Sequence, residues 1–194
     1  MLIKFGEDML EIILIGIIVL ILLFVIVGVG IYNSLITLRN RVENAWSQID
    51  VQLKRRYDLI PNLMETVKGY MKHEKETLEN VTKYRAQLVT GGPAERAKAD
   101  NLLTGALKSL FAVSENYPKL VANENFKMLQ EELAGTENKI SYARQAYNDA
   151  VLQYDTQKEV FPNNVVAGFG NFTEKEYFKA PEGEDVKTAP KVKF

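Results

Sequence analysis

Residues Ile12–Ile31 read IILIGIIVLILLFVIVGVGI, a run of twenty residues without a charged side chain. At ~1.5 Å per helical residue, its length matches the ~30 Å hydrocarbon core of a bilayer. A soluble domain would have to surround so uniformly apolar a helix on every side, which a chain of 194 residues can hardly do. The residues after Ile31 are polar, charged and periodic in the manner of helices. The sequence therefore predicts a membrane anchor followed by a helical domain.

The residues on either side of this run favour a retained anchor over a cleaved signal peptide. Signal peptides have a positive leader, an apolar region of ~7–15 residues and small residues at the cleavage site. Here the leader, residues 1–11, carries Lys4 against three acidic residues, and the exit GVGIYNSL lacks a cleavage pattern. We expect residues 1–11 to form a short extracytoplasmic terminus and residues 12–31 a transmembrane helix.

The basic residues that flank the anchor predict its orientation. Only Lys4 precedes it, whereas Arg39 and Arg41 follow within the ~15–20 residues that count in the positive-inside rule. This asymmetry predicts a single-pass protein of the cell (plasma or inner) membrane, with the N-terminus outside and residues 33–194 in the cytoplasm.

Composition argues against the usual helical-bundle enzymes. The chain has no cysteine and one histidine, His73, which excludes thiolate sites and the paired Glu-x-x-His motifs of di-iron bundles. A phosphate-binding loop is absent, and the net charge of −1 gives no general reason to bind nucleic acid. We therefore predict a non-enzymatic protein without a cofactor, a metal or a nucleic-acid partner.

Apolar residues recur at helical spacing through most of the remaining chain. Leu35, Leu38, Val42 and Ile49 continue the helical pattern beyond the anchor without a proline or glycine. The alternatives are one continuous helix over Ile12–Arg56 and a bend at the hinge that Gly28 and Gly30 offer. Pro61 predicts a turn or sharp kink near residues 57–60, because a proline inside a helix removes a hydrogen bond.

Three further helices are expected: from Pro61 to about Leu88, from about Ala94 to Glu115, and from about Asn123 to Val160. The loop 89–93 and the Asn-Tyr-Pro turn at 116–118 separate them. The fold class is thus all-α: an N-terminal transmembrane helix followed, over residues 32–162, by an antiparallel, coiled-coil-like four-helix bundle. Residues 163–178 are apolar enough to dock, and residues 179–194 are expected to form a flexible tail.

Three blocks of this sequence resemble the LemA family of bacterial membrane proteins. They are NRVENAWSQIDVQLKRRYDLIPNLMETVKGY at 40–70, ANENFKMLQEELAGTENKISYARQAYNDAV at 122–151, and the ending PKVKF at 190–194. The resemblance implies a four-helix, coiled-coil-like bundle on one N-terminal anchor, and it implies no enzymatic activity. Some relatives are proteins of magnetosome membranes, which suggests a role in membrane organisation.

Two groups of polar residues on the first helix are candidate contacts with partners. Asn44 and Gln48 suit helices that pair with other helices, within one subunit or between subunits, since polar residues near a seam fix register. Lys54, Arg55 and Arg56 form the densest basic run. The alternatives for this run are to complement the C-terminal end of the first helix or to contact anionic lipid, which would require the helix to bend.

The end of the chain supplies the remaining candidates. Val192 and Phe194 alternate with lysines and precede a free carboxylate. Such a tail can add as a strand to a partner's sheet or be captured at its terminus; the alternative is a solvated tail.

These features predict a membrane-anchored helical scaffold. Its partners would be the lipid bilayer, further copies of the chain in a homo-oligomer, and other membrane proteins that it recruits or organises. Anchoring confines copies to two dimensions and raises their effective concentration, which favours weak lateral contacts. The competing function is a membrane-shaping protein, which needs a basic face that the sequence does not show.

Overall fold

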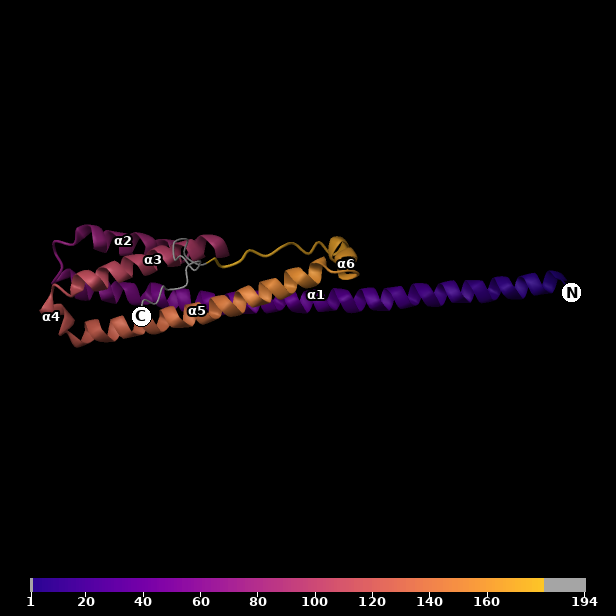
Figure 1. Ribbon diagram of the computed structural model, residues 1–194, viewed down its shortest axis with the longest axis horizontal. Coiled ribbons are helices and arrows are strands. Elements are labelled where there is room, and N and C mark those ends of the chain that lie inside the picture. The colour runs from indigo at the N-terminus through magenta and orange to yellow at the C-terminus, as the bar shows by residue number, and fades with distance from the viewer. Residues whose placement is uncertain (1, 180–194) are drawn as a thin grey trace, which may run out of the picture. The chain divides into compact units, whose positions relative to one another are not determined.

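The computed structural model describes residues 2–179, with side chains from residue 12 onward, and all regular structure in this range is helical. No strand occurs among these residues, so the predicted all-α class is confirmed. The six helices are α1 (Leu2–Lys68), α2 (Lys75–Gln87), α3 (Pro93–Ser114), α4 (Pro118–Val121), α5 (Glu124–Glu159) and α6 (Asn163–Phe169) (Figure 1).

Helix α1 contains the apolar run and continues well beyond it. It is the one described helix that is long and apolar enough to cross a membrane. Residues 12–27 are all exposed, so this part of the helix is not the core of a soluble fold. The helix does not end with the apolar run at Ile31, and it is continuous from Ile12 to Arg56, which the sequence left open.

The expected turn near residues 57–60 and the expected start of the second helix at Pro61 are wrong, because α1 runs through Pro61 to Lys68 and α2 begins at Lys75. Pro61 has no N–H, so the Tyr57 carbonyl four residues earlier loses its helical donor. Arg85 of α2 replaces that donor: its Nε donates to the Tyr57 carbonyl at 2.9 Å, and its guanidinium lies 3.8 Å from the centre of the Tyr57 ring. A hydrogen bond from a neighbouring helix thus removes the reason to break the helix at the proline.

The helix break comes later, at residues 69–74, and the later helices begin where local signals place them. At the start of α3, Gly91 adopts a φ of +84°, and the Glu95 side chain accepts the Gly92 N–H at 3.0 Å. At the start of α5, Asn123 Oδ1 accepts the Phe126 N–H at 3.2 Å. Both helices agree with the predicted boundaries within a residue or two.

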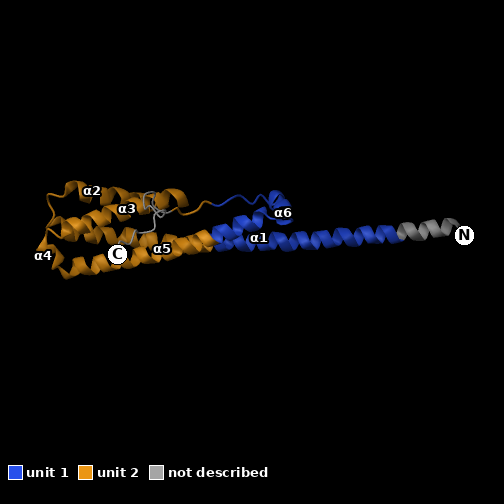
Figure 2. Ribbon diagram, in the orientation of Figure 1, with its two compact units in different colours: residues 1–43, 150–175 blue, residues 44–149, 176–194 orange. Residues whose placement is uncertain are grey.

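The chain divides into two compact units (Figure 2). Unit 1 consists of residues 1–43 and 150–175, and α6 lies beside α1 in it. Its interior combines the helical stripe of α1 with the end of α5 and the segment after it. The buried apolar residues are Leu35, Leu38, Val42, Val151, Tyr154, Ala167 and Phe172.

Unit 2 consists of residues 44–149 and 176–194 and contains parts of α1 and α5 together with α2, α3 and α4. Trp46 lies half-buried with its ring 5.5 Å from that of Tyr147 and 6.3 Å from that of Phe178. The interior residues come from each of the larger helices, among them Ile49, Leu53, Ile60, Val81, Leu103, Leu107, Phe126, Leu133, Ile140 and Tyr147.

Candidate functional site

A groove of about 470 Å³ lies between α1 and α5 in unit 2. The residues of its two walls lie between the buried positions of α1 and α5, such as Ile49 and Leu53 on α1 and Ile140 and Tyr147 on α5. Its lining is mostly apolar, with two glutamines and one lysine: Gln48, Val51, Gln52, Lys139, Tyr142, Ala143 and Ala146.

The groove exposes apolar side chains that the described residues of the unit leave open to solvent. Val51 is 60% exposed and Tyr142 is 76% exposed. The Oε1 atom of Gln52 is buried, yet it accepts no hydrogen bond from any residue that the structure describes. A buried acceptor without a donor is costly, so this wall of the groove carries a local energetic penalty.

The two predicted amide residues lie on the exposed face of α1 near this groove. Gln48 lines the groove, whereas Asn44, one helical turn earlier, is exposed outside it. Neither belongs to the interior of unit 2, so both are accessible to another molecule.

Lys54 and Arg55 are also exposed, and both make ion pairs within unit 2. The Lys54 Nζ lies 2.5 Å from Asp58 Oδ1 on the same helix, and Arg55 Nη2 lies 2.5 Å from Glu132 Oε2 on α5. The triplet lies well inside α1 and not at its end, so the alternative that it complements the end of the first helix does not apply.

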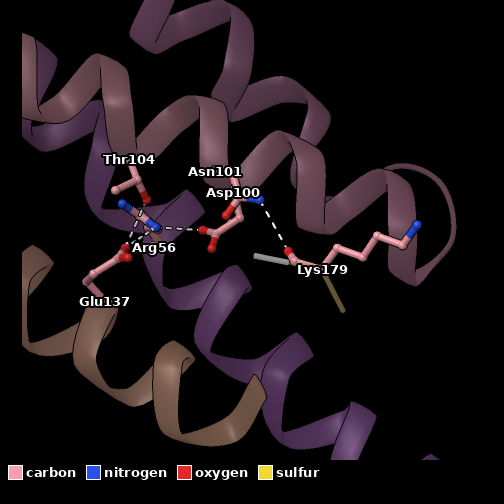
Figure 3. Close-up of polar contacts among 6 residues, drawn as sticks. All are labelled: Arg56, Asp100, Asn101, Thr104, Glu137 and Lys179. Atoms are coloured by element: carbon pink, nitrogen blue, oxygen red, sulfur yellow. Dashed lines mark hydrogen bonds and ion pairs between the residues drawn. The ribbon is translucent and has the colours of Figure 1, made fainter. Parts of the chain in front are cut away.

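Arg56 is buried with only 2% of its surface exposed, and it faces two carboxylates from other helices. Its Nη1 atom lies 2.6 Å from Asp100 Oδ1 of α3 and 2.5 Å from Glu137 Oε2 of α5. Figure 3 shows the side chain reaching between these acids, and Thr104 donates from its hydroxyl to Glu137 at 3.0 Å. Arg56 is therefore not an exposed partner contact as expected. It joins α1 to α3 and α5 through its two ion pairs.

The surroundings of Asp100 show what this arrangement costs. Burial raises the pKa of Asp100, while the Arg56 guanidinium opposes this rise by favouring the charged form. Removing both groups from water is expensive, and the ion pair offsets this only in the geometry that brings all three helices together. The cluster therefore favours one relative register of α1, α3 and α5.

A second arginine links α1 to the start of α3. Arg96 forms an ion pair with Asp50 and donates from Nε to the Leu88 carbonyl at 2.7 Å. Its guanidinium also lies 5.3 Å from the centre of the Trp46 ring. Arg56 and Arg96 are thus both buried, and each joins α1 to α3.

The segment after α6 returns to unit 2 and ends beside Trp46. Asn148 of α5 donates to the Phe178 carbonyl at 3.1 Å and accepts the Phe178 N–H at 2.9 Å. The Tyr147 hydroxyl donates to the Glu176 carbonyl at 2.7 Å, and Asn101 Nδ2 to the Lys179 carbonyl at 3.3 Å. The two tail candidates, Val192 and Phe194, lie outside the described residues.

Sequence reasoning missed Val51 and Tyr142, the most exposed apolar residues of the groove. A signal was present: Val51 falls off the stripe that includes Ile49 and Leu53, and Tyr142 falls off the stripe of Ile140 and Tyr147. An apolar residue outside its helix's buried stripe is a candidate for contact with something else.

The surface so described can bind another helix or chain through apolar and amide contacts. Among the described residues, no group of three or more acidic, histidine or cysteine side chains is placed to hold a metal ion. His73 is exposed in the connection between α1 and α2.

Comparison with known proteins gives consistent relatives. The model of the LemA family matches residues 45–194. Protein LemA of Metamycoplasma hominis is 30% identical over 169 residues, covering 84% of this chain and 76% of the relative. Magnetosome protein MamQ 2 of Paramagnetospirillum magneticum is 24% identical over 189 residues, covering 83% and 70%. Neither name is that of an enzyme. With a family model matched across most of its length, the chain belongs to the LemA family.

Proposed function

We propose that this LemA-family chain is a non-catalytic membrane-anchored scaffold, which self-associates through the α1–α5 groove and recruits or organises other membrane proteins. The observation that carries the proposal is the groove itself, in which Val51 and Tyr142 are exposed apolar side chains. Gln48 and Asn44 supply amides on α1, so a second copy could satisfy these groups reciprocally.

The proposed architecture of the scaffold is an antiparallel four-helix bundle on a single anchor. Contacts in unit 2 support it: on going from Trp46 to Arg55 along α1, the α5 partner moves back from Tyr147 to Glu132. Likewise, Phe111 of α3 packs on Phe126 at a ring distance of 6.0 Å, whereas the earlier residue Thr104 bonds the later residue Glu137. In both pairs, later residues of one helix contact earlier residues of the other, as they do in antiparallel helices.

The test is the mass of the full-length protein in nanodiscs or mild detergent, compared with groove variants. We expect a discrete oligomer for the unmodified chain, since the anchor raises the effective concentration of copies. The variant Val51→Glu/Tyr142→Glu should be monomeric, because it places charges in the groove. Leu102→Glu, a control at an exposed apolar residue of α3, should retain the oligomer. A monomeric unmodified chain would contradict self-association.

The same preparation separates this function from the competing one. A membrane-shaping protein would tubulate liposomes, whereas a scaffold of the kind proposed leaves their shape unchanged. Tubulation that survives the groove substitutions would favour membrane shaping.

A further inference from the structure

A stretch near the end of unit 1 has no charged side chain. Residues 160–173 read VFPNNVVAGFGNFT, and they include the short helix α6. Glu159 and Glu174 flank the stretch on its two sides. Fourteen consecutive uncharged residues are unusual in a chain in which 25% of residues are charged.

The apolar side chains of this stretch divide into a covered set and an uncovered set. Ala167 and Phe172 are buried against the rest of unit 1. By contrast, Phe169 is 90% exposed, Phe161 is 81% exposed, and Val165 is also exposed. Two almost fully exposed phenylalanines close in sequence indicate a surface that contacts an apolar medium or partner.

The structure places this stretch against the end of the apolar run of α1. The Phe172 ring contacts the Tyr32 ring edge-on, with 5.5 Å between the ring centres. A Cβ added to Gly170 would lie 3.1 Å from the Tyr32 ring, so the backbone itself approaches this residue closely. Tyr32 directly follows Ile31, the last residue of the apolar run, which is where a tyrosine meets the headgroups.

Charged residues begin on both segments at the same level of unit 1. The first charged side chain of α1 after the apolar run is Arg39, and its guanidinium lies 5.8 Å from the centre of the Phe172 ring. Glu43 pairs with Lys175 at 3.9 Å. The uncharged part of α1 and the C-terminal end of residues 160–173 are therefore followed by charged residues at the same level. Such a change from uncharged to charged residues is expected where a protein leaves a membrane.

From this placement we propose that α6 and its flanking residues form a second membrane contact, with Phe161, Val165 and Phe169 inserted into the headgroup region beside the anchor. An apolar face of this kind buries ~5–10 Å deep at the boundary between headgroups and acyl chains. The occupant is lipid, because the anchor holds this surface at the bilayer in every copy. The proposal rests on the anchor of the proposed function and is independent of the groove.

The absence of cysteine from the chain allows a direct test with single-cysteine variants carrying a nitroxide spin label. The full-length protein is placed in nanodiscs of phosphatidylcholine and phosphatidylglycerol. Collision rates are measured with oxygen, which concentrates in lipid, and with a water-soluble nickel chelate. The labels are placed at Phe169→Cys, at Val25→Cys in the anchor, and at Leu152→Cys, a control on α5 of unit 1 that is 57% exposed.

The proposal predicts that the oxygen-to-nickel ratio at residue 169 exceeds that at residue 152 several-fold and approaches that at residue 25. A water-like ratio at 169 with a lipid-like ratio at 25 would overturn the second contact and leave the anchor intact. A water-like ratio at 25 would instead overturn the anchor. Protection of residue 169 from both reagents would show that protein covers it, which also contradicts a lipid contact. Trp46 fluorescence verifies that each variant retains its fold.

Discussion

At Pro61, a side chain from one helix supplies the hydrogen bond that a proline removes from another. The Tyr57 carbonyl, which Pro61 deprives of its helical donor, receives the Arg85 Nε instead. The local sequence predicts a break there, and the donor that prevents it lies on another helix. Sequence reasoning therefore failed at this position for a physical reason: the compensating group is not local.

This compensation predicts coupling between positions 61 and 85. Arg85→Met should lower the free energy of unfolding by about 1 kcal/mol, because it removes the donor of a part-buried carbonyl. In a Pro61→Ala background the new N–H serves Tyr57, so the same substitution should cost less. Urea unfolding followed by the fluorescence of Trp46, the single tryptophan, measures both effects. Equal costs in the two backgrounds would show that Arg85 acts only through its contact with the Tyr57 ring.

The Arg56 cluster predicts a large difference between two adjacent arginines. Arg56→Met should lower the free energy of unfolding by about 3–5 kcal/mol, because it leaves the buried Asp100 carboxylate without its cation. Adding Asp100→Leu should recover part of this loss, since the uncompensated charge is then gone. The exposed neighbour provides the control: Arg55→Met should cost less than about 1 kcal/mol. Similar losses at both positions would contradict the internal role of Arg56.

Asp100 also predicts a pH dependence with a definite sign. Burial raises the pKa of Asp100 in the folded protein, so the folded state holds this proton more tightly than the unfolded chain. The free energy of unfolding, relative to Asp100→Asn, should therefore fall as pH rises from ~3.9 to the raised pKa and stay constant above it. Urea unfolding of both proteins at a series of pH values measures this difference. A difference that grows with pH would mean that Arg56 outweighs burial.

Among the helices, local sequence signals predict some boundaries and not others. Helices α3 and α5 were predicted within a residue or two because Gly92-Pro93 and Asn123 supply local start signals. The continuation of α1 past Pro61 was not predicted, because the donor that replaces the lost hydrogen bond at Tyr57 comes from Arg85 of α2. The burial of Arg56 was also missed, because its partners Asp100 and Glu137 are distant in sequence and no local pattern links them.

The segment after α6 gives a prediction at this scale, because one side chain holds its backbone from both sides. Asn148→Ala removes the bonds to both the N–H and the carbonyl of Phe178. We expect faster hydrogen exchange at the Phe178 amide and a red shift of Trp46 emission as the ring loses its cover. Asn138→Ala, at an exposed position of the same helix, is the control and should change neither. Unchanged exchange at Phe178 would show that ring packing alone holds the segment.

At the scale of the whole molecule, the apolar run predicted a helix long enough to cross a membrane, and three blocks predicted the family; both predictions needed no knowledge of tertiary contacts. The groove could not be predicted in the same way. Its walls come from α1 and α5, which are distant in sequence. The helical stripes mark Val51 and Tyr142 as apolar residues off the core, but they do not show that the two side chains line one groove.

The orientation of the chain is testable at this scale. The flanking arginines predict that unit 2 faces the cytoplasm. A single cysteine at Val89, an exposed position of the α2–α3 connection, should therefore resist a membrane-impermeant maleimide in intact cells and react after permeabilisation. Labelling in intact cells would reverse the assigned topology. Val25→Cys, within the apolar run, controls for protection by lipid.

The packing of Phe178 on Trp46 also sets an order of events during synthesis. Trp46 leaves the ribosome 132 residues before Phe178, the ring that covers it. At a translation rate of 5–20 residues per second, this delay is roughly 10 s. One side of the Trp46 ring of the nascent chain therefore remains exposed during this interval. Any product terminated before residue 178 keeps that apolar surface, which distinguishes unfinished chains from finished ones for the proteases and chaperones of the cell.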